Sequence, residues 1–474
     1  MKRTFLYTCC LLSALMFCGI SGCKKFVDIP PPITQLETPS VFSSASDATA
    51  AQTAIYTKMA GSESYNMALN TGMLGDELTN NSSNVTLIEE YTNSMQSKDI
   101  NSPWINGYNY IYQANAVISG LQAYSGIPPS ISNQLMGEAK FIRAFWDFYL
   151  TECYGAIPLA NTPDYSVNTV LGRTPQNQVY RQIITDLNDA EALLSSNYVD
   201  ASDTTITTDR SRPTSWAAAA LLARAYLFSG SYDSAEQQAS LVIGNTSLYN
   251  LCSNLDNVFL ANSSEAIWQL PPVQPASNLA TTDGKDFVLI SGPSKTSNNN
   301  TATISPQLMN SFESNDLRNS QWISSYAYNS NVYYFPFKYK IRSIPSTGTP
   351  TEYTMVLRLA EQYLIRSEAR AQQGNLTGAL QDLNVIRNRA GLGNYSGSMD
   401  QASILSAIWH ERQVELFTEW GARWFDLNRT NTINSVMGVV TPLKHGTWNA
   451  SDALFPIPLT ELTYDPNLIQ NPNY

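Results

Sequence analysis

Ala225-Tyr226-Leu227-Phe228-Ser229-Gly230-Ser231-Tyr232-Asp233-Ser234-Ala235 is the stretch that decides the fold. It joins an Ala-rich, apolar helical pattern over residues 215–229 to a second helical pattern over residues 232–243. Its spacing recurs 144 residues later as Ala369-x4-Gly374-x4-Ala379. Small residues at these positions let two antiparallel helices approach closely, and the glycine closes the turn, as in a tetratricopeptide hairpin. Unrelated α-helical hairpins are the alternative interpretation of this pattern.

The rest of the chain extends this helical pattern on both sides. Hydrophobic periodicity and turn residues predict further helices over 109–124, 131–153, 180–194, 356–373 and 376–389. Residues 245–350 lack a sustained helical period and contain short apolar runs among Ser, Asn, Gly and Pro, which predicts short strands and long ordered loops. The predicted fold class is therefore mainly α. Tetratricopeptide-like hairpins at about 109–153, 177–243 and 356–390 pack against an irregular, loop-rich region with a few short β-strands.

The N-terminus has the layout of a lipoprotein export signal. Lys2 and Arg3 precede an apolar stretch, which ends in the small-residue sequence Ile20-Ser21-Gly22-Cys23. We predict a signal peptide over residues 1–22, lipidation of Cys23, an anchor and Pro-rich tether over 23–45 and one domain over 46–474. The alternatives are an ordinary secretory signal or a transmembrane helix, but the apolar run is shorter than the roughly 20 residues that span hydrocarbon.

Composition excludes several classes of function. The net charge of −11 argues against nucleic acid as a partner, because that binding needs clustered Lys and Arg. Two histidines in 474 residues are too few for His-rich metal sites or facial triads. Four of the six cysteines lie in the first 23 residues, and Cys153 and Cys252 are expected in the core. We therefore predict no cofactor and no metal site, and a search for nucleophile-elbow, phosphate-loop and dinucleotide motifs finds none.

Five ordered blocks of sequence resemble the SusD/RagB family of surface glycan-binding lipoproteins of Bacteroidetes. The blocks are Cys23-Lys24-Lys25-Phe26-Val27-Asp28-Ile29-Pro30-Pro31, residues 137–159 (from Gly-Glu-Ala-Lys-Phe-Ile-Arg-Ala-Phe to Tyr-Gly-Ala-Ile-Pro-Leu), residues 357–392, residues 411–429 and residues 454–474. The likeness spans nearly the whole chain after Cys23.

The resemblance implies a tetratricopeptide-type fold with an irregular ligand-binding face and no catalytic activity. It implies capture of an oligosaccharide or polysaccharide and delivery to a SusC-like TonB-dependent outer-membrane transporter. It also implies an outer-membrane location, with a lipid anchor and the body facing the cell exterior. A peptide or another nutrient is the alternative ligand, because family members also serve peptide importers.

Sugar recognition needs aromatic rings that cover the C–H face of a pyranose, together with amide, carboxylate or guanidinium groups for its hydroxyls. Trp104-Ile105-Asn106-Gly107-Tyr108-Asn109 places an aromatic and an amide at the start of a predicted helix. We predict a glycan site formed by Asp76, Trp104, Asn109, Trp322 and Tyr328, each of which has packing in the core as its alternative role. Five other tryptophans are assigned to the core: Trp146, Trp216, Trp409, Trp420 and Trp424.

The densest charge cluster in the chain is interpreted as structural. Glu411, Arg412, Glu415, Glu419, Arg423 and Asp426 lie at helical spacings that favour Arg–carboxylate ion pairs. Two other classes of function stay open. A surface glycoside hydrolase would use paired carboxylates such as Asp76 and Glu77, at ~5–10 Å from each other in a cleft. A tetratricopeptide scaffold would bind only a protein.

Overall fold

The computed structural model describes residues 41–96, 102–273, 277–293 and 301–474. Phe42–Tyr474 forms one compact unit. The predicted signal peptide, Cys23 and nearly all of the tether lie outside the described residues, so these three assignments stay predictions. Within the part that is described, no helix has the length and apolarity needed to cross a membrane.

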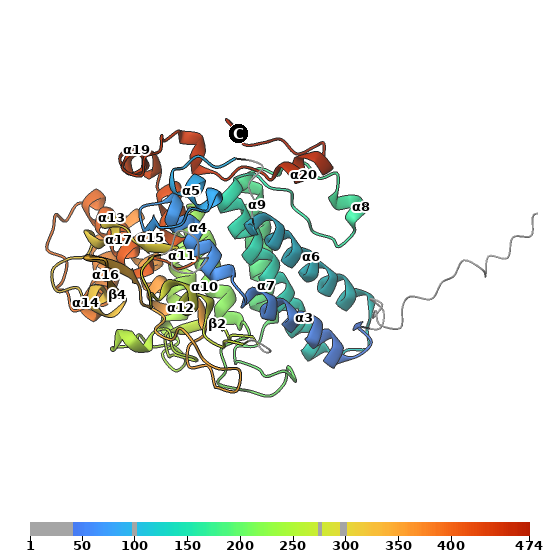
Figure 1. The fold of residues 1–474 in the computed structure, drawn as a ribbon. Helices are drawn as coiled ribbons and strands as arrows, with labels where there is room; N and C mark the ends of the chain where they lie inside the picture. Colours follow the sequence, from blue (N-terminus) through green and yellow to red (C-terminus); the bar gives the residue numbers. More distant parts are fainter. Residues whose placement is uncertain (1–40, 97–101, 274–276, 294–300) are drawn as a thin grey trace, which may run out of the picture. The chain divides into compact units, whose positions relative to one another are not determined.

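Helices make up most of the unit (Figure 1). The longer helices are α3 (Ala45–Met59), α4 (Glu63–Leu74), α5 (Val85–Tyr91), α6 (Ser102–Ala123), α7 (Pro129–Tyr154), α9 (Gln176–Leu193), α10 (Ser215–Phe228), α11 (Tyr232–Gly244), α15 (Leu359–Gln372), α16 (Leu376–Arg389), α17 (Gln401–Leu416), α18 (Ala422–Arg429) and α19 (Ile433–Leu443). Short helices are α8 (Tyr165–Asn168), α12 (Thr282–Phe287), α13 (Pro306–Met309), α14 (Leu317–Gln321) and α20 (Leu459–Tyr464), with 3-10 turns η2 (Leu255–Asn257) and η3 (Ala450–Ala453).

Residues 225–235 join α10 to α11 in a helical hairpin. Residues 369–379, which have the same spacing, join α15 to α16 in a second one. Gly230 and Gly374 have φ of +76° and +83° in the two turns. A side chain would be strained in this left-handed region, and no neighbouring atom limits the space at either glycine. The glycines are therefore required by backbone conformation, while the alanines on either side are fully buried between the helices.

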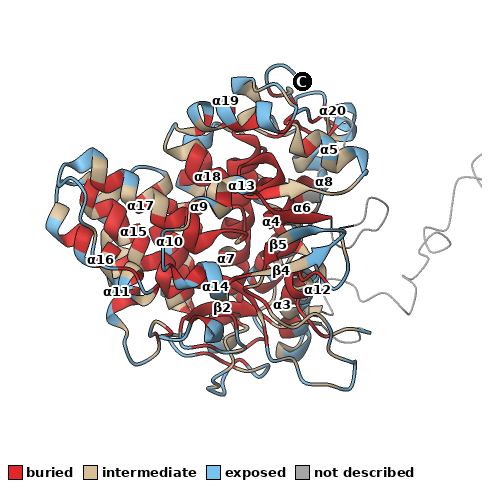
Figure 2. Ribbon diagram, turned by 60° about the vertical axis from the view of Figure 1, so that its left-hand side comes forward, coloured by how far each residue is buried: buried red, intermediate tan, exposed pale blue. Residues whose placement is uncertain are grey.

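The two hairpins share a core. Ala223, Leu227, Ala235 and Ala239 of the first hairpin pack against Ile365 and Ala369 of α15. Arg224 of α10 adds a bidentate ion pair to Glu361 of α15, with donor–acceptor distances of 2.7 and 2.6 Å. The close-packed, red interior of these helices is visible in Figure 2. The helical hairpins therefore stack in the way that the repeated spacing predicts.

A second helical layer is joined by one buried arginine. Arg143 of α7 donates two hydrogen bonds to Asp186 of α9, at 2.8 and 2.6 Å, and a third to Asn115 of α6, at 2.8 Å. The side chains of Arg143 and Asp186 are 8% and 1% exposed. Three helices are thus held in one relative position by a single fork-shaped guanidinium, a geometry that a lysine could not supply.

The strands are short and pair in three antiparallel couples: β1 (Leu78–Asn80) with β3 (Ala302–Ile304), β2 (Ala266–Leu270) with β6 (Thr354–Arg358), and β4 (Ile323–Tyr328) with β5 (Asn331–Pro336). Two helices begin earlier than predicted: α6 begins at Ser102 and not at residue 109, and α9 begins at Gln176 and not at residue 180. One prediction is wrong in the type of element. Residues 356–358 belong to a buried strand, and the helix begins at Leu359. A run of buried apolar residues fits a central strand and a buried helix equally well, so the period alone could not separate them. Residues 245–350 also contain short helices that the periodicity missed.

The C-terminal region is hydrogen-bonded to a helix near the start of the unit. Lys444, which follows α19, donates from Nζ to the carbonyl oxygens of Met73, Leu74 and Gly75 at the end of α4, at 2.9, 2.8 and 3.0 Å. Lys444 thereby satisfies carbonyls at a buried helix terminus, and Asn93 donates from Nδ2 to the Leu74 carbonyl as well, at 2.9 Å. Burial lowers the pKa of Lys444 to about 7. The C-terminal region therefore fixes the segment that begins at Gly75.

Candidate functional site

The β4–β5 hairpin lies in the irregular region, and its turn is at the protein surface. Tyr328 pairs with Asn331, so the connection has only two residues, Asn329 and Ser330, with φ of +48° and +63°. Positive φ at both positions is the requirement of a type I′ turn, whose twist matches that of the strands. The hairpin tip is pale blue in Figure 2, because residues 327–332 are exposed.

Four tyrosines lie on this hairpin, which we call the tyrosine hairpin (residues 323–336). Directly paired residues of antiparallel strands share a face, so Tyr326 and Tyr333 lie on the same face as Tyr328, while Tyr334 lies on the other. The first face rests on a small apolar cluster of Val288, Leu289 and Phe335, against which Tyr326 and Tyr333 pack. This support makes the first face rigid, whereas Tyr334 stands on the other face beside the exposed Val332.

Tyr328 is the exposed ring of the supported face. It is 45% exposed, and its ring lies so close to the backbone of Gly292 that a Cβ there would meet ring atoms at 2.2–2.6 Å. One side of the ring is therefore held by backbone and the other meets solvent. Such a ring can cover the C–H face of a pyranose, and the Asn and Ser side chains around the turn can bond sugar hydroxyls.

The prediction for Trp322 is wrong as a surface contact. Trp322 is fully buried, with its ring edge-on to Phe259 and its Nε1 donating to the carbonyl of Leu255 at 3.1 Å. The ammonium of Lys338 lies 4.9 Å from the ring centroid. Trp322 is a core residue that fills the space beneath the hairpin, and no ligand can reach it in this conformation.

The prediction for Asp76 is also wrong. Asp76 is 5% exposed, and both of its carboxylate oxygens accept hydrogen bonds from Arg423, at 2.9 and 2.7 Å. The neighbouring Glu77 is 2% exposed, and burial, followed by the charge of Asp76, raises its pKa to about 8. Both acids therefore serve the packing of α4 against the C-terminal region and are closed to a ligand.

Trp104 and Asn109 lie on α6 but face different surroundings. Trp104 is 2% exposed, and its ring packs against Tyr108 and Tyr154 with centroids 4.9 Å apart in both pairs. It forms an inner wall of a surface hollow, so its role in glycan binding stays a prediction. Asn109 is exposed and accepts a hydrogen bond from Gln113. No contact joins either residue to Tyr328 in the described part, so a single site of all five residues does not form.

Sequence reasoning overlooked Tyr326, Tyr333 and Tyr334. Tyr333 and Tyr334 belong to one of the short apolar runs within residues 245–350 that predict strands. The signal was present, because two tyrosine-rich runs flank Asn329-Ser330, and Asn is favoured at positive φ. The assignment of Trp146, Trp420 and Trp424 to the core is confirmed, and Trp216 and Trp409 are half-buried.

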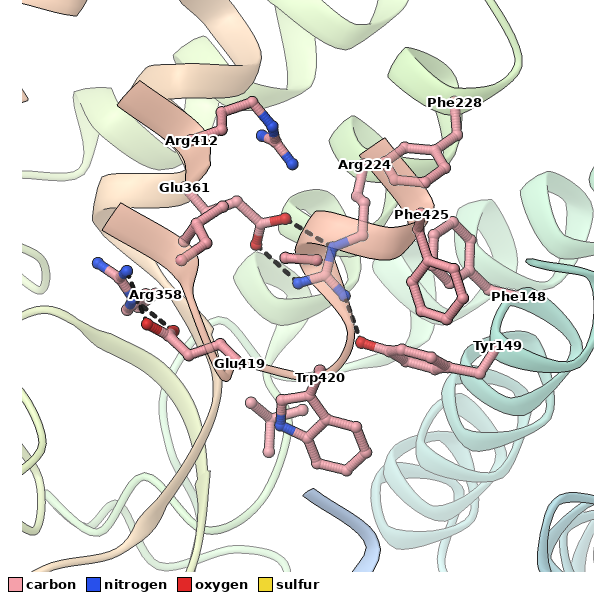
Figure 3. A pocket seen from close by; sticks show the side chains of 13 residues that line it. Phe148, Tyr149, Arg224, Phe228, Arg358, Glu361, Arg412, Glu419, Trp420 and Phe425 are labelled. Carbon is pink, nitrogen blue, oxygen red and sulfur yellow. Dashed lines mark hydrogen bonds and ion pairs between the residues drawn. The ribbon is translucent and has the colours of Figure 1, made fainter. Parts of the chain in front are cut away.

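The charge cluster is an internal ion-pair network, as predicted. Glu415 is fully buried and accepts from Arg318, Arg358 and Arg389, which hold the pKa of its carboxyl well below the ordinary value. Figure 3 shows the adjoining interior cavity, where Arg224 meets Glu361 and Tyr149, and Arg358 meets Glu419. Its volume of about 30 Å³ suits a water molecule and is too small for a sugar.

The described residues offer few groups that could bind a metal ion. Among the described residues, no group of three or more His, Cys, Asp or Glu side chains could hold a metal ion. Asp283 lies at the start of α12, where burial raises its pKa to about 7 and Ser64 is its neighbour at 3.5 Å. Cys153 and Cys252 are both buried free thiols, which confirms their assignment to the core.

Two family models match most of the chain between them. A family described as "Starch-binding associating with outer membrane" matches residues 25–227, and one described as "SusD family" matches residues 295–474. Among curated relatives, SusD-like protein P2 of Formosa agariphila is 25% identical over 96% of this chain and 97% of its own length. SusD-like protein P25 of the same organism is 26% identical over 80% of both chains.

Solved structures share the fold. A SusD superfamily protein from Bacteroides vulgatus superposes with a TM-score of 0.78 at 20% identity, over 91% of this chain and all of that one. A laminarin-binding SusD-like protein gives 0.75 at 23% identity, over 90% and 99%. The mainly α, tetratricopeptide-like fold is thereby confirmed. Two ordered family matches, full-length relatives and the shared fold establish that the chain belongs to the SusD/RagB family.

Proposed function

We propose that this protein is a non-catalytic glycan-binding protein, and that the tyrosine hairpin is its binding surface. The observation that carries the proposal is the exposed ring of Tyr328, held against Gly292 on a hairpin with a fixed two-residue turn. A ring that is packed on one side loses less conformational entropy than a free one when a sugar stacks on it. Membership of a family described as starch-binding, and the fold shared with a laminarin-binding protein, support a glycan as the ligand.

The two acids that a glycoside hydrolase would use are buried. Asp76 and Glu77 are 5% and 2% exposed, and Arg423 occupies Asp76. A glycosidase needs one acid to reach the glycosidic oxygen and another to reach the anomeric carbon, or a water beside it. Two buried neighbours cannot do this. A peptide or another nutrient stays the alternative ligand.

The binding test compares two tyrosines of the same hairpin. Tyr328 and Tyr334 are almost equally exposed, at 45% and 42%, but only Tyr328 has the supported face behind it. Affinity is measured by calorimetry for laminarin, starch, xylan, mannan and a peptide mixture. We expect Tyr328→Ala to weaken glycan binding at least tenfold, the loss of about 1.4 kcal/mol of contact, while Tyr334→Ala stays within about twofold.

Three results would contradict the proposal. Equal affinities for wild type and Tyr328→Ala would remove the hairpin from the site. Binding of the peptide mixture with no binding of any polysaccharide would replace the ligand class. Release of shortened sugars during incubation with wild-type protein would show that the chain is catalytic.

The cellular part of the proposal follows the family. We propose that lipidated Cys23 anchors the protein in the outer membrane with its body outside the cell, and that it passes the glycan to a SusC-like TonB-dependent transporter. Cys23→Ala should release the protein from membranes, and protease added to intact cells should digest the wild type. Co-purification with a transporter of this class tests the partner, and isolation of the chain alone from gently solubilised membranes would count against it.

A further inference from the structure

A second surface feature lies away from the tyrosine hairpin. It is a hollow of about 290 Å³ between the first half of α6, the segment around α8, and α20 with the residues that follow it. In Figure 1, α8 and α20 lie on the opposite side of the view from β4. Its lining includes four aromatic residues and two acids: Trp104, Tyr112, Tyr165, Tyr464, Glu461 and Asp465.

The hollow has a fixed floor and an open aromatic rim. Trp104 is 2% exposed and packs edge-on against Tyr154, while Tyr108 donates from its hydroxyl to the carbonyl of Pro158 at 2.9 Å. At the rim, Tyr165 and Tyr464 are 77% and 80% exposed. Exposed aromatic rings around an aromatic floor are the lining that a stacked sugar ring needs.

The hollow contains hydrogen-bond acceptors. Asn168 donates from Nδ2 to the carbonyl of Thr162 at 2.7 Å, but its Oδ1 is shielded from solvent and accepts no hydrogen bond from the residues that the structure describes. An unsatisfied acceptor of this kind costs about 1–3 kcal/mol, and the Asn168 side chain must turn toward the hollow before a sugar hydroxyl can donate to it. Glu461 is half-buried in the lining and adds a carboxylate acceptor for sugar hydroxyls, whereas Asp465 is 8% exposed and already accepts from the backbone N–H of Asn467.

Charge narrows the class of sugar. No Lys or Arg belongs to the described lining of the hollow, whereas Glu461 and Asp465 both do. The neighbouring Arg173 is already committed, because its guanidinium donates to the carbonyl oxygens of Tyr154, Ala156 and Ile469. Two carboxylates without a free cation disfavour uronic acids and sulfated sugars, since like charges repel in a partly desolvated site.

We propose that this hollow is a second glycan site, which binds an uncharged pyranose unit independently of the tyrosine hairpin. The proposal rests on the glycan-binding function proposed above. A consequence is that a polysaccharide long enough to reach both sites binds more tightly than a short oligosaccharide, because the second contact forms within the same complex.

The experiment counts sites by calorimetry with four neutral hexasaccharides: laminarihexaose, maltohexaose, cellohexaose and xylohexaose. Three forms of the protein are compared: wild type, Tyr328→Ala, and the double variant Tyr165→Ala/Tyr464→Ala, whose exposed rings are not needed for folding. For the hexasaccharide that binds, we expect two molecules per wild-type chain and one per chain for either variant. The affinity of the surviving site should stay within twofold, and an oligogalacturonate should not bind the hollow.

Each result decides one proposal separately. One hexasaccharide per chain for both wild type and the double rim variant would overturn the second site while leaving the hairpin site in place. Two per chain for Tyr328→Ala would refute the hairpin and leave the hollow. Binding of the oligogalacturonate that is lost in the rim variant would overturn the uncharged class. If none of the four neutral hexasaccharides binds, the hollow is not a site for an uncharged sugar, and a protein becomes the better occupant of this aromatic face.

Discussion

Replacing Arg143 by Met tests the idea that one buried guanidinium positions three helices. The substitution keeps most of the side-chain volume but removes the hydrogen bonds to Asp186 and Asn115. Asp186 is 1% exposed, so its carboxylate would be left unpaired in the core. Removal of one partner of a buried ion pair costs about 3–5 kcal/mol.

The expected shift in melting temperature follows from the size of the unit. An unfolding entropy of about 2.1 cal/mol/K per residue gives roughly 0.9 kcal/mol/K for a unit of about 430 residues. A loss of 4 kcal/mol should therefore lower Tm by about 4 °C in calorimetry. The double variant Arg143→Met/Asp186→Leu should regain most of this loss, because it removes the unpaired charge as well.

The same two helices supply a matched control. Lys140 of α7 pairs with Asp189 of α9, but these side chains are 19% and 47% exposed. An ion pair that solvent screens contributes less than about 1 kcal/mol, so Lys140→Met should change Tm by no more than about 1 °C. Equal shifts for Arg143→Met and Lys140→Met would refute the reasoning, because burial would then not distinguish the two pairs.

Three further predictions concern a turn, a buried acid and the hairpin. Gly374→Ala should cost about 1–2 kcal/mol in urea denaturation because φ is +83°, whereas Gly244→Ala, at a helix end with free space and no positive φ, should be neutral or stabilising. The pKa of Glu77 is about 8 in the fold against 4.5 as its ordinary value, so the fold binds more protons and stability falls as pH rises from 4.5 to 8. Glu77→Gln stays neutral, so its Tm advantage over wild type should grow between pH 5 and pH 8.5, and a constant difference would contradict this. Gly292→Ala should displace Tyr328 and weaken glycan binding at least fivefold with Tm within about 1 °C of wild type; unchanged affinity would show that the ring position is unimportant.

Local chemistry made the helical part predictable. The repeated Ala-x4-Gly-x4-Ala spacing sets where two helices approach and where the chain must turn, and both glycines have the positive φ that this requires. The arginine-rich blocks were likewise recognisable as structural, because buried carboxylates and guanidiniums pair with one another, although their partners here lie on distant elements. The boundary at Arg358 escaped prediction, since a buried strand next to a buried helix leaves no change in polarity.

The candidate site depended on packing that local sequence cannot encode. Trp322 and Tyr328 are six residues apart in the same irregular region, yet one is fully buried and the other is 45% exposed. The difference arises because Phe259 and Phe417, from distant parts of the chain, enclose the tryptophan. Asp76 is a residue type that could bind a ligand, but its carboxylate accepts a hydrogen bond from Arg423, 347 residues later.

By itself, the sequence determined the helical hairpins and the family, because both depend on residue types at fixed local spacings. It also indicated which charged residues are ion-paired, but their partners lie on distant elements, as for Glu415 with Arg318 and Arg358. Only the tertiary structure decided which aromatic rings are available to a ligand. Exposure is the result of which distant segments cover a side chain, and that depends on the packing of the entire fold. The tyrosine hairpin and the hollow beside α8 and α20 became visible only when those segments were in place.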